Sequence, residues 1–194
     1  PILPRRWPDM PQPQPFDASH TRYAPNLPFP PYRHVPGETP HPHTHPQGHS
    51  HGRELKYYGL PLASDNWARN GIYLGATDLF NYAYWWEAHE WWEALWRRAE
   101  LGSPSALFLQ GLIQVTAAMI KWNQGNLRGV ITLHGHAREK LERVLRREGG
   151  ETYMGVELPG FLENLDRFLQ AFPQSAQEAY GDPSTAPLIR LVGG

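Results

Sequence analysis

YAYWWEAHEWWEALWRR, the stretch from Tyr82 to Arg98, contains five of the eight tryptophans and three glutamates but no glycine or proline. A helix is therefore its favoured conformation. At about 100° per residue, a helix here has a mainly aromatic face made of Tyr82, Trp85, Trp86, His89, Trp92, Glu93 and Trp96. Its opposite face contains Glu87, Trp91, Ala94 and Arg98.

One imidazole and one carboxylate, those of His89 and Glu93, interrupt the aromatic face one helical turn apart. A face of this composition is suited to burial, and burying two polar groups is costly unless they are paired. We therefore expect His89 and Glu93 to bind each other, a metal ion or another polar group.

The next helix is predicted over residues 104–124, after Ser103 as its N-cap, and it is apolar on almost all sides. Its polar exceptions Gln110, Gln114 and Lys121 share one stripe. Buried amides need partners. Because a short loop makes neighbouring helices pack antiparallel, we expect Gln110 and Gln114 to meet His89 and Glu93 in a polar network.

A third long helix is predicted over residues 127–148, with His134 on its inner face, and a last amphipathic helix over residues 161–172 after a loop ending at Pro159. The predicted fold class is all-α: a helical bundle of three long helices plus shorter ones, preceded by an extended Pro/His-rich arm. The predicted divisions are the arm over 1–65, the bundle over 66–175 and a tail over 176–194.

Residues 1–65 hold fifteen of the twenty prolines, which stop helices and remove strand donors. Aromatic residues nevertheless recur along this arm, which suggests anchoring. They are Trp7, Phe16, Tyr23, Phe29 and Tyr32. The arm either wraps its own domain or lies on a neighbouring subunit or partner, and a plain spacer is the remaining alternative.

The arm also contains the segment HPHTHPQGHSH, with His41, His43, His45, His49 and His51. In an extended backbone the first three of these project to the same side. We expect a low-specificity chelator for Zn, Ni or Cu, or else an incidental biased composition.

Charge and composition limit the function classes. Eighteen basic and nineteen acidic side chains give a net charge of -1, which argues against nucleic-acid binding. The absence of cysteine excludes thiolate ligands and thiol nucleophiles. No stretch approaches about 18 uninterrupted apolar residues, so we expect no transmembrane segment and a cytoplasmic location.

Three motifs occur in order: EAHEWWEALW from Glu87, FLQGLIQ from Phe108, and GNLRGV from Gly125 followed by AREKLERV. Over roughly residues 77–145 they closely resemble the small helical proteins of domain-of-unknown-function family 309. The resemblance implies an all-helical bundle, and members of that family are often labelled predicted metal-dependent hydrolases. The matched polar positions are His89, Glu90, Glu93, Gln110 and Gln114.

The segment His89-Glu90-Trp91-Trp92-Glu93 has the spacing of a zincin helix in which glutamate replaces the second histidine. In this interpretation His89, Glu93 and His134 bind a divalent metal such as zinc, and Glu90 is the catalytic residue that orients or deprotonates a water. Glu90 also points about 100° away from His89, toward Arg97, where an ordinary surface pair is the alternative. A non-catalytic hydrogen-bond network inside the bundle is the competing interpretation of the whole cluster.

Two functions follow from these alternatives. The sequence slightly favours a non-catalytic accessory protein that attaches to a larger assembly, or to further copies of itself, through the aromatic arm and Trp91. The alternative is a metal-dependent hydrolase with its site between the first two long helices.

Overall fold

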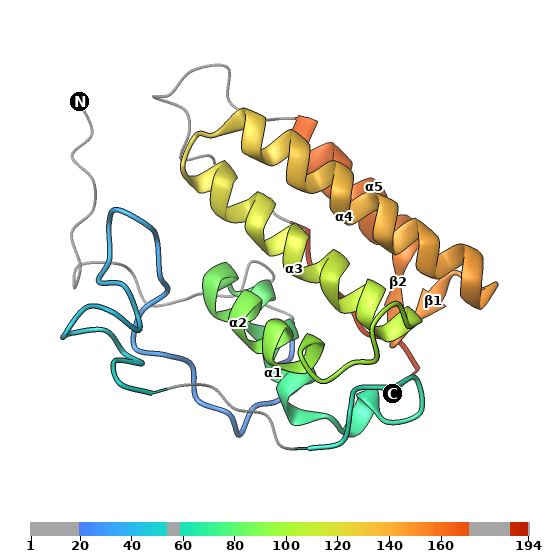
Figure 1. The fold of residues 1–194 in the computed structure, drawn as a ribbon, viewed down its shortest axis with the longest axis horizontal. Coiled ribbons are helices and arrows are strands. Elements are labelled where there is room, and N and C mark those ends of the chain that lie inside the picture. The colour runs from blue at the N-terminus through green and yellow to red at the C-terminus, as the bar shows by residue number, and fades with distance from the viewer. Residues whose placement is uncertain (1–19, 54–58, 171–186, 194) are drawn as a thin grey trace.

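The computed structural model describes residues 20–53, 59–170 and 187–193. Its helices are η1 (Trp67–Arg69), α1 (Gly71–Asn81), α2 (Trp85–Trp96), α3 (Pro104–Asn123), α4 (Leu127–Glu148) and α5 (Leu158–Gln170). The strands β1 (Thr152–Tyr153) and β2 (Val156–Glu157) form a small antiparallel hairpin. The predicted all-α helical bundle is confirmed (Figure 1).

α3 forms the middle of the bundle, between α2 and α4 (Figure 1). Its side chains are buried on most sides, as its apolar sequence predicts. α3 and α4 approach closely at Gly111, where an added Cβ would lie 2.7 Å from the Leu141 side chain. Glycine at this position therefore permits the helix contact.

The helix caps follow the sequence closely. Ser103 accepts a hydrogen bond from the Ala106 N–H at the start of α3, and Asn126 accepts one from the Gly129 N–H at the start of α4. Gly149 ends α4 in the left-handed conformation. The last helix begins earlier than expected, at Leu158, because Pro159 is tolerated within a first turn.

The junction between α1 and α2 differs from the prediction. Residues 78–81 complete α1, and the chain reverses at Ala83 with φ +62. α2 consequently begins at Trp85 rather than Tyr82. Asp78 and Asn81 are buried because the arm and the C-terminal segment pack over this end of α1.

The described part of the arm lies on its own helical domain. The backbone N–H groups of Tyr23 and Ala24 each donate to the Asp78 carboxylate at 2.8 Å, and Arg22 pairs with it at 3.4 Å. The His34 N–H donates to Glu87 of α2 at 2.8 Å. Of the alternatives for the arm, the structure supports packing on its own domain for residues 20–53.

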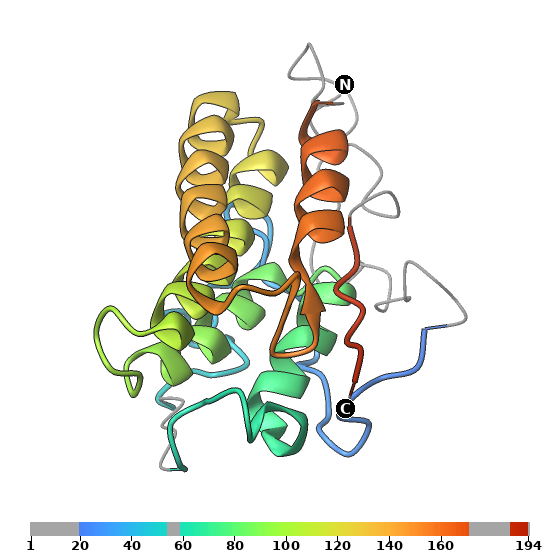
Figure 2. The same cartoon turned by 90° about the vertical axis from the view of Figure 1, so that its right-hand side faces the viewer.

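The C-terminal segment 187–193 also lies on the domain, beside α5 and the hairpin (Figure 2). Its Ile189 is buried and exchanges two hydrogen bonds with the Asn81 side chain, at 2.8 and 2.9 Å. The predicted bundle–tail division at residue 176 lies outside the described residues. Within the described ranges, no helix combines the length and apolar character that crossing a bilayer requires.

Candidate functional site

The side chains of His89, Glu90 and Glu93 gather on the partly exposed side of α2. One ligand atom from each lies within 4.8 Å of the others. His89 and Glu93 are one turn apart, and Glu90 is three residues before Glu93, so its carboxylate belongs to the same group although its Cα lies about 100° around the helix from that of His89. The prediction that Glu90 points to Arg97 is wrong: Arg97 pairs with Glu93 at 3.1 Å.

Thr116 on α3 orients the His89 imidazole. Its hydroxyl donates to the Ile113 carbonyl at 2.7 Å and lies 3.3 Å from His89 Nδ1. Because the single hydroxyl proton is used on Ile113, the oxygen accepts from His89 Nδ1–H. In neutral His89 the lone pair is then on Nε2, which is the arrangement found in metal-binding histidines.

This donor set suits a divalent metal ion. One imidazole and two carboxylates are typical protein ligands of zinc and similar ions. Side-chain exposures of 30% for Glu90 and 28% for Glu93 keep the group in contact with solvent. The residues thus satisfy the chemical requirements for an ion with access to water.

The predicted polar network with Gln110 and Gln114 is not formed. No hydrogen bond joins either amide to His89 or Glu93 among the described residues, and the buried Gln114 Oε1 has no hydrogen-bond partner there. The partner of His89 on α3 is Thr116 instead. A threonine surrounded by apolar residues gave no sign of this role in the sequence.

His134, the predicted third ligand, belongs to a different cluster. Its Nε2 lies 2.8 Å from Asp166 of α5, which also pairs with Arg138. His134 therefore links α4 to α5, and it is not part of the His89 group. His134 is partly buried, and the helix that its side chain meets is α5.

The His-rich segment of the arm folds into turns, so the expectation of an extended backbone is wrong. The His45 N–H donates to the His41 carbonyl and the Gly48 N–H to the His45 carbonyl. His41 and His43 nevertheless lie close together, with ring centroids 6.4 Å apart. His41 packs against Trp86 with ring centroids 5.5 Å apart, His43 Nε2 lies 3.4 Å from Glu90, and His45 is exposed.

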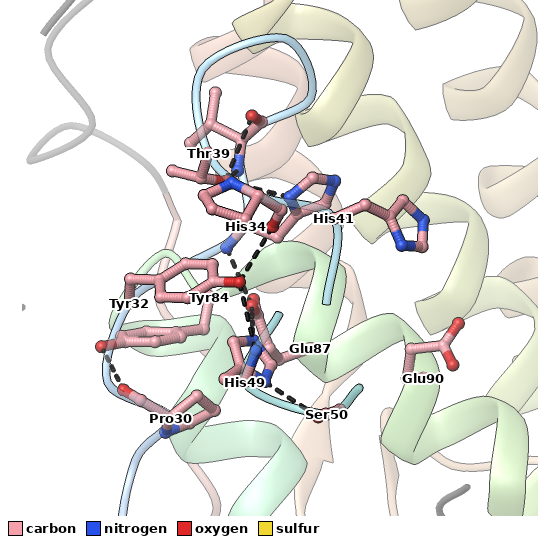
Figure 3. A network of polar contacts seen from close by, with 12 residues as sticks. Pro30, Tyr32, His34, Thr39, His41, His49, Ser50, Tyr84, Glu87 and Glu90 are labelled. Carbon is pink, nitrogen blue, oxygen red and sulfur yellow. Dashed lines mark hydrogen bonds and ion pairs between the residues drawn. The ribbon is translucent and has the colours of Figure 1, made fainter. Parts of the chain in front are cut away.

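His49 and His51 have separate structural roles. His49 Nε2 donates to the buried Glu87 carboxylate at 3.0 Å, and the His49 ring packs on Tyr32 (Figure 3). His51 Nδ1 donates to the His43 carbonyl at 3.0 Å. The segment is therefore attached to α2 rather than forming a free chelating tail.

The aromatic residues predicted as partner contacts pack within the chain where they are described. Phe29 stacks on Tyr84, the Tyr23 hydroxyl accepts from the Leu191 N–H, and Tyr32 is buried. Trp91 packs against α1 at Gly75 and is partly buried, and its role as a partner contact stays a prediction. Trp7 and Phe16 lie outside the described residues.

Sequence reasoning missed the second polar cluster, which surrounds Glu87 (Figure 3). Glu87 is only 2% exposed, although helical periodicity places it opposite the aromatic face. Burial and the nearby Glu87 charge raise the pKa of Tyr84 to about 12. Burial, together with the His41 and His49 rings, lowers the pKa of His34 to about 4.

Comparison with known proteins supports one relationship. Residues 73–133 match the family model described as Domain of unknown function (DUF309), and the match includes His89, Glu90, Glu93, Gln110 and Gln114. The family resemblance of the sequence is thus confirmed over these residues. Comparison with curated proteins and comparison with solved structures each found no match.

Proposed function

We propose that this protein binds a divalent metal ion through His89, Glu90 and Glu93 and uses it in a hydrolytic reaction. The observation that carries the proposal is the convergence of three ligand atoms within 4.8 Å. The Thr116 hydroxyl adds support, because it leaves the His89 Nε2 lone pair available.

The surrounding residues prepare the site for this role. Thr116 fixes the His89 ring, while Arg97, 3.1 Å from Glu93, restrains one carboxylate and partly balances its charge. Partial exposure of Glu90 and Glu93 gives water and a substrate access from one side. When bound, a divalent ion would supply Lewis acidity and lower the pKa of a coordinated water.

The role proposed here for Glu90 differs from the catalytic role predicted from the sequence. Its carboxylate lies within the ligand group, and so we assign Glu90 to metal binding rather than to a separate general base. The two roles are separable by experiment, since a lost ligand weakens metal binding whereas a lost base slows turnover alone.

The accessory function stays a prediction of the sequence. Of its predicted contacts, Tyr23, Phe29, Tyr32 and Trp91 pack within the described part of the chain, and Trp7 and Phe16 lie outside it. Metal binding has the more direct structural support and is therefore the function that we put forward.

The test is metal binding by the full chain, purified without a metal-affinity resin. We expect one zinc or similar ion per chain after dialysis, measured by elemental analysis, and expect His89→Ala and Glu93→Gln to lose it. His136→Ala, an exposed histidine on α4, is the matched control and should retain the ion. Hydrolysis of ester and phosphoester substrates should stop with chelator and return with metal.

Equal metal content in the wild type and His89→Ala would contradict the proposed site. Circular dichroism of each variant separates loss of metal from loss of fold. Metal binding without any metal-dependent hydrolysis would retain the ion site but reject the enzymatic part of the proposal.

A further inference from the structure

The His-rich turns lie against the first half of α2 (Figure 3), and His43 approaches Glu90, one of the candidate metal ligands. Two hydrogen bonds to the buried Glu87 hold them there, one from the His34 N–H at 2.8 Å and one from His49 Nε2 at 3.0 Å. The His49 side chain is 5% exposed, so this attachment is shielded from water.

His43 is the arm histidine that faces the metal site. Its Nδ1 lies 3.0 Å from the Arg53 carbonyl, which can only accept, so Nδ1 carries the proton. In neutral His43 the lone pair is consequently on Nε2, which lies 3.4 Å from Glu90 Oε2. Two acceptor atoms this close repel each other unless a proton or a metal ion lies between them.

The neighbouring histidines have the opposite orientation. His41 Nδ1 accepts from the N–H groups of His43 and Thr44, and His45 Nδ1 accepts from the Gln47 N–H. In their neutral forms, both rings therefore carry the proton on Nε2 and offer no lone pair there.

We propose that His43 is an additional metal ligand, supplied by the arm and brought to the α2 site beside Glu90. This inference rests on the proposed function. His43 lies outside the group of atoms within 4.8 Å of one another, and so it reaches the ion by a shift of its side chain, which is 31% exposed. With His89, Glu90 and Glu93 it forms a four-ligand set of two nitrogens and two carboxylates, which suits zinc.

Bonds already present prepare His43 for this role. The Arg53 carbonyl fixes its tautomer, and His51 Nδ1 donates to the His43 carbonyl at 3.0 Å, which braces the turn. Such outer contacts commonly orient metal-binding histidines. The arm is therefore a functional part of the site as well as a covering segment.

The experiment uses the full chain and compares His43→Ala with His45→Ala, a neighbouring exposed histidine. Zn²⁺ affinity is measured by calorimetric titration, and Co²⁺ binding by visible absorption. We expect His43→Ala to weaken Zn²⁺ binding at least about tenfold, because even outer-shell partners are worth about 10- to 100-fold in affinity. The Co²⁺ spectrum should also change, whereas His45→Ala should match the wild type in both.

The outcomes separate this inference from the proposed function. If His89→Ala abolishes binding and His43→Ala does not alter it, the α2 site stands and the arm ligand is refuted. If His43→Ala abolishes binding and His89→Ala has no effect, the ion is bound by the arm alone and both proposals fail. If the wild type binds neither ion, both also fail, and His43 and Glu90 form a simple proton-bridged pair.

Discussion

Two buried carboxylates hold the same arm, but their environments differ. Asp78 accepts the Tyr23 and Ala24 N–H groups, one on each oxygen, and it pairs with the permanently charged Arg22. Glu87 accepts from the His34 N–H and from His49 on a single oxygen, and its Oε2 has no hydrogen-bond partner.

This difference indicates that the two carboxylates hold the arm in different ways. At Asp78 both oxygens are satisfied and the charge is balanced by the Arg22 guanidinium, which is the arrangement of a permanent anchor. At Glu87 the charge is only partly satisfied, because one carboxylate oxygen has no hydrogen-bond partner and the side-chain partner of the other is a histidine, not an arginine. The Glu87 end, next to His43 and Glu90, is therefore the adjustable attachment.

The largest effect is expected at Asp78. In Asp78→Asn the amide group presents N–H toward a backbone donor, and the charge opposite Arg22 is lost. We expect the free energy of unfolding to fall by about 3 kcal/mol, measured by urea denaturation. The control is Glu163→Gln, which removes an exposed ion pair with Arg167. It should change the free energy of unfolding by less than about 0.5 kcal/mol. A similarly small loss at Asp78 would refute its role as an anchor.

The next prediction concerns pH. A decrease in pH should weaken only the attachment of the arm at Glu87. His34 has a folded-state pKa of about 4 against an ordinary 6.5, because of burial and then the rings of His41 and His49. The folded state therefore binds the proton less readily than the unfolded state, and stability falls as pH decreases from about 6.5 to about 4. We expect a loss of about 1 to 2 kcal/mol between about pH 7 and pH 5.

Urea denaturation at the two pH values measures this loss of stability. His34→Asn should reduce the pH dependence of the free energy of unfolding, since asparagine does not titrate. Hydrogen exchange, corrected for the intrinsic effect of pH, locates the change. The His34 amide should lose protection before the Tyr23 and Ala24 amides, which donate to Asp78. Simultaneous loss of amide protection at Asp78 and at Glu87 would contradict the different roles of the two attachments.

The smallest effect is expected for Glu87→Gln. Glutamine retains an oxygen that accepts from the His34 N–H and His49, while removing a buried charge whose second oxygen has no hydrogen-bond partner. These effects oppose each other, so we expect the free energy of unfolding to change by less than about 1 kcal/mol. Glu87→Gln is measured beside Asp78→Asn, with Glu139→Gln at an exposed position as the control. An equally large loss of stability in both variants would contradict the distinction between the two carboxylates.

Much of the architecture could be predicted because it follows from local pattern. The apolar sequence of α3, the caps Ser103 and Asn126, and the turn at Gly149 all act within a few residues of where they occur. The pair His89 and Glu93 is likewise a one-turn relation within α2, and the structure places both in the same ligand group.

The errors arose where distant segments meet. Asp78 receives the arm across 55 positions and Glu87 receives it across 53, so helical periodicity alone could not predict their burial. His134 shows the same limit, because the helical pattern placed it on the inner face of α4 but did not identify its partner Asp166. The His-rich segment likewise forms turns in place of the extended backbone that its sequence predicts.

The sequence by itself determined the helices and the residues that share each helical face, since these depend on interactions three or four positions apart. Only the tertiary structure decided which carboxylates are buried and which histidine approaches Glu90. Burial and pairing of this kind depend on which segments cover one another, and a surface position such as Glu87 becomes an interior one when the arm is laid across it.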